Sequence, residues 1–206
     1  HYPNAGVNTV GGRVSLIRTF GTHSYRTSVE TRRKARAEIE RYFSYDVVLY
    51  GATRRKGIIW PDDRVLVPGA FGVAGINIKP MYNLNACFRA GISLDAQYDE
   101  SANIKDHVVG DDRSAENIRF YRPPFREQFG VGLSLRAELV MPIFSINLGV
   151  GHNVFYQGED LKGFYQIAAL KTSITRRLFL HVGYQLRNFK DPNNLMLGLG
   201  YRFNGR

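Results

Sequence analysis

Serine and histidine residues that could together catalyse hydrolysis are few in this sequence. His23 and Ser24 are adjacent, and adjacent residues of an extended chain point in opposite directions, so we do not expect them to form a nucleophile and base. His107 lies in a polar stretch, residues 99–128, that also contains two serines. A long polar loop would hold such groups too loosely for catalysis. The sequence has no GxSxG, HExxH or CxxC motif and no phosphate-binding loop.

The same stretch contains groups that could bind a divalent cation. Asp106, Asp111 and Asp112 lie close to His107 in the sequence, and carboxylate oxygens are ligands that such cations prefer. A solvated acidic loop has the same composition, and we favour that interpretation. We therefore predict no metal site and no cofactor.

The composition indicates how the chain could sit in a membrane. The 206 residues are enough for one domain, and no run of 18 apolar residues is available for a transmembrane helix. Mean hydropathy is only −0.27, although 44% of the residues are hydrophobic. A transmembrane β-barrel has this combination, because its apolar residues alternate with polar ones. Thirteen Phe and twelve Tyr would supply its interfacial aromatic girdles.

The net charge of +10 bears on the partners of the protein. In a soluble protein this charge would first suggest nucleic acid. For an outer-membrane barrel, the nearer anions are the phosphates of lipopolysaccharide. We therefore predict outer-membrane lipid and lipopolysaccharide as partners, and no nucleic acid.

Strict alternation in several segments predicts antiparallel transmembrane strands. In 129–139, every second residue from Phe129 to Leu139 is apolar, and the residues between them are small or polar. The segments 87–98 and 178–187 repeat the pattern. Because their polar faces are rich in Gly, Ser and Gln, they suit a barrel lumen better than bulk water. We expect Phe129, Val131, Leu133 and Leu135 to face lipid, and Arg136 and Glu138 to face the lumen.

Nine strands can be drawn, and short and long connections alternate between them, as in outer-membrane barrels. They span 9–20, 45–56, 69–80, 87–98, 128–140, 144–155, 164–174, 178–188 and 195–203. Because nine is odd, we expect at least one further strand upstream of His1, so that 1–206 is one N-terminally incomplete barrel domain. If 87–98 and 128–140 are neighbours, Arg89 and Glu138 form an ion pair in the lumen.

Residues 21–44 are predicted to form a short basic helix on the periplasmic side. Thr27 and Glu30 have the spacing of a capping box, and apolar residues then recur every four positions as far as Phe43. Four basic residues lie between them, at 32–34 and 36. The helix Thr27–Phe43 could contact a protein partner in an outer-membrane complex, or could simply cover the end of the barrel.

Three segments resemble known families of barrels. The last segment, 195–203, resembles the closing strand of outer-membrane barrels, whose final aromatic residues are read by the assembly machinery; Tyr201 and Phe203 would supply this signal. The segment Pro3-Asn4-Ala5-Gly6-Val7-Asn8-Thr9 resembles outer-membrane lipid A deacylases and their acyloxyacyl-hydrolase-like relatives. The stretch Phe120–Glu127 is similar to long members of this group from Bacteroidales.

The resemblance implies ester hydrolysis of lipopolysaccharide acyl chains in the outer membrane of a Gram-negative bacterium. In the family, a strand ends in His-x-Ser-Asn, and a short loop leads to Pro-Asn-x-Gly-x-(Glu or Asn). One alignment puts Asn8 at the orienting residue, with Asn4 and Gly6 at the substrate rim and the Ser and His upstream of His1. A second puts Pro3 at the nucleophile. Neither completes a triad.

Two functions remain open from the sequence. The first is a lipid A deacylase-like serine esterase, active only if an upstream segment supplies the His and Ser. The alternative is a non-catalytic barrel subunit of an assembly or export complex. A pore is a weaker third possibility, because charges of both signs are scattered along the lumenal faces.

Overall fold

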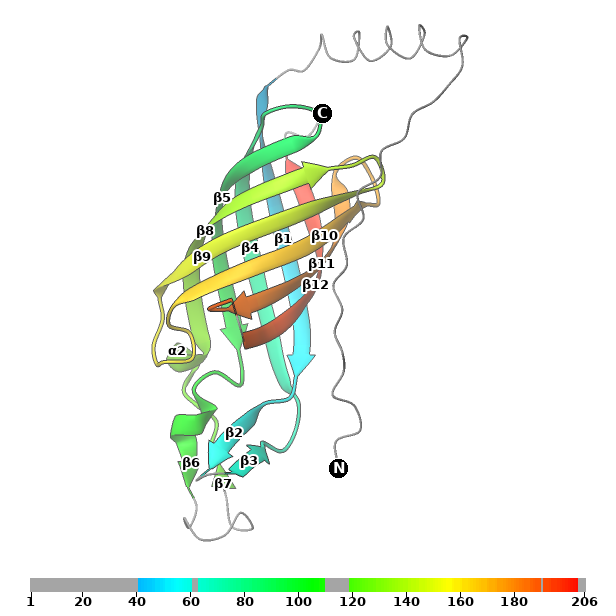
Figure 1. The fold of residues 1–206 in the computed structure, drawn as a ribbon. Helices are drawn as coiled ribbons and strands as arrows, with labels where there is room; N and C mark the ends of the chain where they lie inside the picture. Colours follow the sequence, from blue (N-terminus) through cyan, green and yellow to red (C-terminus); the bar gives the residue numbers. More distant parts are fainter. Residues whose placement is uncertain (1–40, 61–62, 110–118, 190, 204–206) are drawn as a thin grey trace, which may run out of the picture. The chain divides into compact units, whose positions relative to one another are not determined.

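The computed structural model describes residues 41–60, 63–109, 119–189 and 191–203. Within them, eight antiparallel strands close into a barrel in the order β1-β12-β11-β10-β9-β8-β5-β4 (Figure 1). The barrel strands are β1 (Tyr42–Arg54), β4 (Phe71–Asn83), β5 (Phe88–Asp99), β8 (Phe129–Val140), β9 (Phe144–Phe155), β10 (Phe164–Ser173), β11 (Leu178–Arg187) and β12 (Asp191–Phe203). Lengths of 10 to 13 residues fit tilted transmembrane strands. The predicted all-β transmembrane barrel is confirmed.

The predicted number of strands is wrong. β1 pairs with β4 on one side and with β12 on the other, so both of its edges are occupied and the barrel closes with eight strands. Closure therefore requires no strand from 9–20 and none upstream. Alternation within a strand reveals the strand itself but not its neighbours, so this error could not be seen from the sequence. Residues 9–20 lie outside the described part of the chain.

The predicted helix also ends too late. Tyr42, Phe43 and Ser44 belong to β1, where Phe43 points outward and Ser44 is buried in the lumen. The outward alternation of Phe43, Tyr45, Val47 and Leu49 continues the strand and overrides the four-residue spacing that suggested a helix. The rest of the predicted helix, residues 21–40, lies outside the described residues. No described helix is long and apolar enough to span a membrane.

The two faces of the wall differ as the alternation predicts. On β8, Leu133 and Leu135 are 51% and 70% exposed toward the membrane, whereas Arg136 and Glu138 are 3% and 0% exposed in the lumen. Outward aromatic rings gather at both ends. Phe43 contacts Tyr82 at one end, and at the other the ring of Phe125 stacks on those of Tyr98 and Phe129. The apolar wall between these rings has the pattern of a transmembrane barrel.

The connections define the two ends of the barrel. Turns of three or four residues join β4 to β5, β8 to β9 and β10 to β11, and we call this the periplasmic end. The opposite, outer end carries the hairpin of β2 (Gly57–Trp60) and β3 (Asp63–Leu66), helix η1 (Ile104–His107), the pair β6 (Val108–Val109) and β7 (Arg119–Phe120), and α2 (Phe125–Gln128). Ile58, Val67 and Ile104 form the small apolar core of this outer part.

Candidate functional site

The periplasmic half of the lumen holds a closed ion-pair network. We call Asp46, Arg89, Glu138, Lys171 and Arg202 the inner network. Arg89 Nη1 lies 3.0 Å from Glu138 Oε1, and the two residues are direct partners in the β5–β8 ladder. Lys171 Nζ contacts both Glu138 and Asp46, with 2.7 Å to Asp46 Oδ2. Arg202 Nε lies 2.9 Å from Asp46 Oδ1.

A second polar layer lies nearer the outer end and centres on Asp95. Its carboxylate accepts hydrogen bonds from Arg136 Nη2 at 2.8 Å and from the Tyr165 hydroxyl at 2.7 Å. Gly132 and Gly151 make room for Tyr165, because a Cβ atom at either position would lie within 2.6 Å of its ring or hydroxyl. The small residues of the lumenal faces therefore allow large polar side chains to fill the lumen. A filled lumen does not suit a solute channel.

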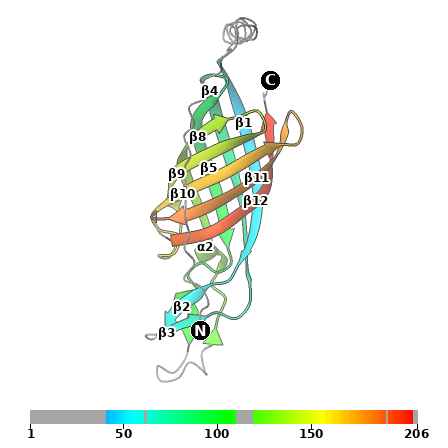
Figure 2. The ribbon, with the colours of Figure 1, turned by 45° about the vertical axis from the view of Figure 1, so that its right-hand side comes forward.

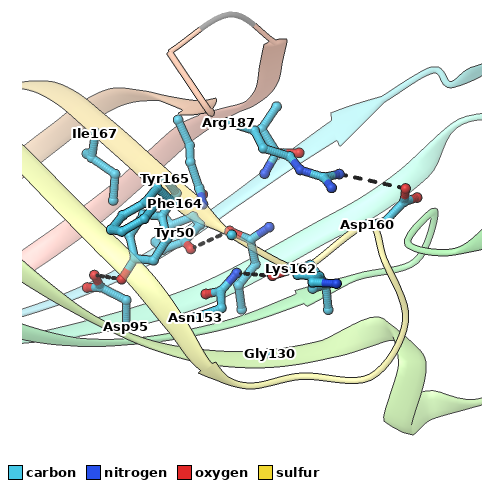
Figure 3. A pocket seen from close by; sticks show the side chains of 15 residues that line it. Tyr50, Asp95, Gly130, Asn153, Asp160, Lys162, Phe164, Tyr165, Ile167 and Arg187 are labelled. Carbon is cyan, nitrogen blue, oxygen red and sulfur yellow. Dashed lines mark hydrogen bonds and ion pairs between the residues drawn. The ribbon is translucent and has the colours of Figure 1, made fainter.

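A third set of ion pairs lies at the outer mouth. Arg54 Nη2 lies 2.7 Å from Asp99 Oδ2. Asp160, in the β9–β10 loop, pairs with Lys56. Arg187 Nη1 lies 3.7 Å from the other carboxylate oxygen of Asp160 (Figure 3). A cavity of about 30 Å³, large enough for one water molecule, lies between this layer and Asp95.

A larger groove opens beside this cavity. Its volume is about 660 Å³, and we call it the outer groove. The residues that line it are Thr53, Arg54, Arg55, Lys56, Gly57, Asp160, Tyr184, Arg187, Asn193, Asn194 and Leu195. Four of these residues are cationic and one is acidic, so the groove favours an anionic ligand.

Lys56 and Asp160 each influence the pKa of the other. Burial raises the pKa of Asp160, but the charge and hydrogen bond of Lys56 outweigh this effect, so the pKa lies below its usual value of 3.8. Burial lowers the pKa of Lys56 below its usual value, and Asp160 opposes that shift. Asp160 also accepts a hydrogen bond of 2.9 Å from the amide of Asn103. This pair therefore ties the β9–β10 loop to the segment before η1.

The described histidines do not form a nucleophile–base pair with a described serine. His107 Nε2 lies 2.8 Å from Glu127 Oε2, so it has an acidic partner. The Ser101 hydroxyl instead donates to Asp99 Oδ1 at 2.8 Å. His152 packs its ring edge-on against Phe164, and His181 is fully buried in the lumen. No hydrogen bond joins a serine hydroxyl to any of these rings within the described ranges.

Comparison with known proteins decides the family. The profile of the acyloxyacyl hydrolase C-terminal domain matches residues 43–205, which is most of the chain and includes all eight barrel strands. The chain belongs to the acyloxyacyl hydrolase family. Its barrel resembles the lipid A deacylases of this family, so the protein is an outer-membrane β-barrel of a Gram-negative bacterium, and family membership implies a lipopolysaccharide or lipid ligand.

Solved structures give a weaker likeness. Ail, the attachment invasion locus protein of Yersinia pestis, crystallised in complex with the heparin analogue sucrose octasulfate, is 16% identical with a TM-score of 0.43, over 78% of this chain and 98% of that one. The backbone structure of Ail in a phospholipid bilayer nanodisc is 19% identical with a TM-score of 0.41, over 78% and 99%. No curated protein matches the sequence significantly.

A hairpin inside the matched region also resembles the pattern His-x-Ser-Asn, loop, Pro-Asn, and the sequence analysis missed it. β11 ends in Gln185-Leu186-Arg187, Asn188 comes directly after it, and Pro192-Asn193-Asn194 follows a few residues later. This is the family's order of strand end, Asn, loop and Pro-Asn. If the two patterns correspond, Gln185 would take the place of the His, and Arg187 the place of the Ser. The shared Asn and Pro-Asn residues were the signal that could have found this hairpin.

The residues singled out from the sequence fall into two groups. Asn4, Gly6 and Asn8 lie outside the described residues and outside the region that the family profile matches. Arg89 and Glu138 are brought together as an ion pair of the inner network. Tyr201 and Phe203 lie at the end of β12 with their ring centroids 4.7 Å apart, and both are exposed on the outer face of the wall.

Proposed function

We propose that this barrel binds lipid A-type glycolipids at its outer rim without hydrolysing their ester bonds. The proposal rests on the sequence at the end of β11, whose likeness to the His-x-Ser-Asn pattern would put Gln185 and Arg187 at the positions of the family's base and nucleophile. A glutamine amide cannot take a proton from a nucleophile, and a guanidinium that stays protonated cannot attack an ester.

The surroundings of Arg187 support binding rather than catalysis. Arg187 lines the outer groove together with Arg54, Arg55 and Lys56. Lipid A-type glycolipids carry phosphate groups, and arginine side chains bind phosphate through charge-assisted, often bidentate, hydrogen bonds. The site therefore retains groups that would hold the head of the lipid, while it lacks those that would cleave the acyl ester.

The proposal is tested with the full chain in lipid nanodiscs. Lipid A is added, bound lipid is counted by native mass spectrometry, and released fatty acids are measured by mass spectrometry. We expect binding, and fatty-acid release no higher than in nanodiscs without protein. Release that is lost on Ser101→Ala or Ser114→Ala would reveal a nucleophile in the loop between β5 and β8 and would overturn the proposal.

The roles of the N-terminal residues Asn4, Gly6 and Asn8 remain predictions. Asn8 as an orienting residue, and Asn4 and Gly6 as rim residues, would matter for an esterase that a preceding His-x-Ser completes. Release of fatty acids that is lost on Asn8→Ala would favour that esterase over a binding barrel. Contact of a protein partner with the basic segment Thr27–Phe43 also stays a prediction.

A further inference from the structure

The wall of the barrel is incomplete between β1 and β12. These strands pair from Tyr45–Phe203 to Gly51–Leu197 and no further. Both continue outward without each other: β1 stays paired with β4 as far as Arg54, and β12 is paired with β11 from Asp191 onward. Figure 2 shows the two strands side by side near the end of β12 and diverging toward the outer end. We call this divergence the seam.

The outer groove lies in the seam and connects the membrane side of the wall with the mouth. Thr53, Tyr184 and Leu195 line the groove and are exposed on the outer face, whereas Asn194 is buried on the lumenal face. Arg54 crosses the seam, because its Nη1 donates to the Asn193 carbonyl oxygen at 2.9 Å and to Asn193 Oδ1 at 2.6 Å. A side chain thus takes the place of the missing ladder hydrogen bonds.

The unpaired strand edges at the seam limit which groups can lie beside them. Backbone N–H and C=O groups at unpaired strand edges cost several kcal/mol each when they face hydrocarbon. The facing edges Ala52–Arg54 and Asn193–Met196 share no ladder hydrogen bonds. They therefore require water or a polar group beside them, which places the seam at the level of the lipid head groups and not of the acyl chains.

The charges of the seam specify the polar group. Arg54, Arg55, Lys56 and Arg187 supply four positive charges, and their partners Asp99 and Asp160 supply two negative ones. Arg55 is exposed, and no ion pair or hydrogen bond of its side chain is found within the described residues. The surplus matches the charge of a phosphate group, and Tyr184 and Leu195 provide an apolar border where acyl chains can leave the groove.

We propose that the seam is a lateral entry through which the phosphorylated head group of an outer-leaflet glycolipid reaches the outer groove, with its phosphate bound by Arg55 and Arg187. This inference rests on the proposed function and adds the route and the anchoring residues. A free phosphate ion would satisfy the same cations but would leave the apolar border unused. A lipid phosphate satisfies both, so we commit to the lipid.

The test compares two charge reversals at the outer end of the full chain in nanodiscs. Arg55→Glu removes the seam cation for which the described residues provide no ion-pair partner. Arg126→Glu changes another exposed cation, which lies in α2 and does not line the outer groove. Native mass spectrometry measures bound lipid A, dephosphorylated lipid A and phosphatidylethanolamine. Heat-modifiable migration on gels reports whether each barrel is folded, and Arg55→Gln serves as a milder variant if the reversal does not fold.

The proposal predicts that lipid A affinity falls about tenfold or more in Arg55→Glu, as expected for the loss of one charged hydrogen bond, and stays at the wild-type level in Arg126→Glu. The affinity of the wild type for dephosphorylated lipid A should be lower than its affinity for lipid A by a similar factor. Equal affinity of the two variants for lipid A would overturn the proposal that the seam binds the lipid phosphate, while leaving the proposed function intact. Absence of lipid A binding by the wild type would overturn both. Displacement of lipid A by millimolar inorganic phosphate would point to a free-anion site and overturn the lipid assignment.

Discussion

The two ends of the same lumen solve the problem of buried charge in different ways. In the inner network every carboxylate is shared among several cations, and Asp46, Glu138 and Lys171 are 0–3% exposed. At the outer mouth the pairs are fewer, Lys56 and Arg187 keep 18% and 30% of their side-chain surface exposed, and Arg55 has no acidic partner among the described residues. The difference indicates that the inner network stabilises the barrel, whereas the outer mouth remains available to a ligand.

Removal of one inner carboxylate should have the largest effect on stability. Glu138→Gln would leave Arg89 and Lys171, each only 3% exposed, short of negative charge. Breaking a buried network in this way costs about 3–5 kcal/mol. Urea unfolding in lipid vesicles, followed by gel mobility, measures the change.

The matched control at the outer mouth is Asp160→Asn. It also replaces a carboxylate with an amide, but its partners are partly exposed and can be hydrated, so we expect about 1 kcal/mol or less. Similar losses for Glu138→Gln and Asp160→Asn would contradict the distinction between the two ends.

A cation on the lipid face should have the next largest effect. Leu133→Arg places a charge toward the hydrocarbon on β8 and should cost about 2–4 kcal/mol. Val154 is 59% exposed near the outer rim of β9. Val154→Arg should cost about 0–1 kcal/mol, because the free-energy penalty for a charge on the lipid face decreases toward the membrane interface. The fraction of folded protein after insertion into vesicles measures both. Equal tolerance would mean that β8 is placed at the wrong depth.

Ser134→Arg, on the lumenal face of β8, is not a suitable tolerated control for this experiment. The Ser134 hydroxyl donates to Asp95 Oδ2 at 2.6 Å and accepts from Arg136 Nε at 2.8 Å. A second arginine there would meet Arg136 in a filled layer. Substitutions on the lumenal face of this barrel are therefore restricted by packing and charge, whereas substitutions on the lipid face are restricted by hydrophobicity.

Acid should loosen the outer mouth by a smaller amount. Because the folded pKa of Asp160 lies below 3.8, its contact with Lys56 contributes fully above about pH 4 and is lost as the pH falls below 3.8 toward the folded value. Hydrogen exchange of the Asn103 amide, corrected for the intrinsic rate, should lose protection over this range. Asp160→Asn should show no such pH dependence; a wild-type profile that matches the variant would exclude a role for this pair.

The sequence predicted local features of the barrel much better than pairings between distant strands. The alternation in β5 and β8 was enough to place Arg89 opposite Glu138. A period of two determines the face of the wall on which each side chain lies, and the distance from the periplasmic end of each strand determines its height in the wall. The pairing of β1 with β12 joins strands at opposite ends of the described chain, and no local pattern signals it. The hairpin β2–β3 was missed although its apolar run and the Pro-Asp dipeptide that follows β2 were visible in the sequence.

The candidate site was only partly predictable for a related reason. The family pattern was assigned to residues 1–9 because Pro3-Asn4 and Gly6 were conspicuous, whereas Asn188 and Pro192-Asn193 lack the His and Ser that define the motif. The outer groove combines Arg55, Asp160 and Arg187 from three separate connections or strand ends. Such a site exists only after closure of the barrel, so the sequence offers its residue types but not their proximity.

The short β1–β12 ladder also has a consequence for the order in which the barrel forms. It contains seven partner pairs, against thirteen between β1 and β4, and it joins segments that are almost the whole described chain apart. Loop closure of that length is entropically costly, and pairings distant in sequence form late. We therefore expect this ladder to form last and to open first. A ligand held at its outer end would act where unfolding begins, and would lengthen the lifetime of the folded barrel.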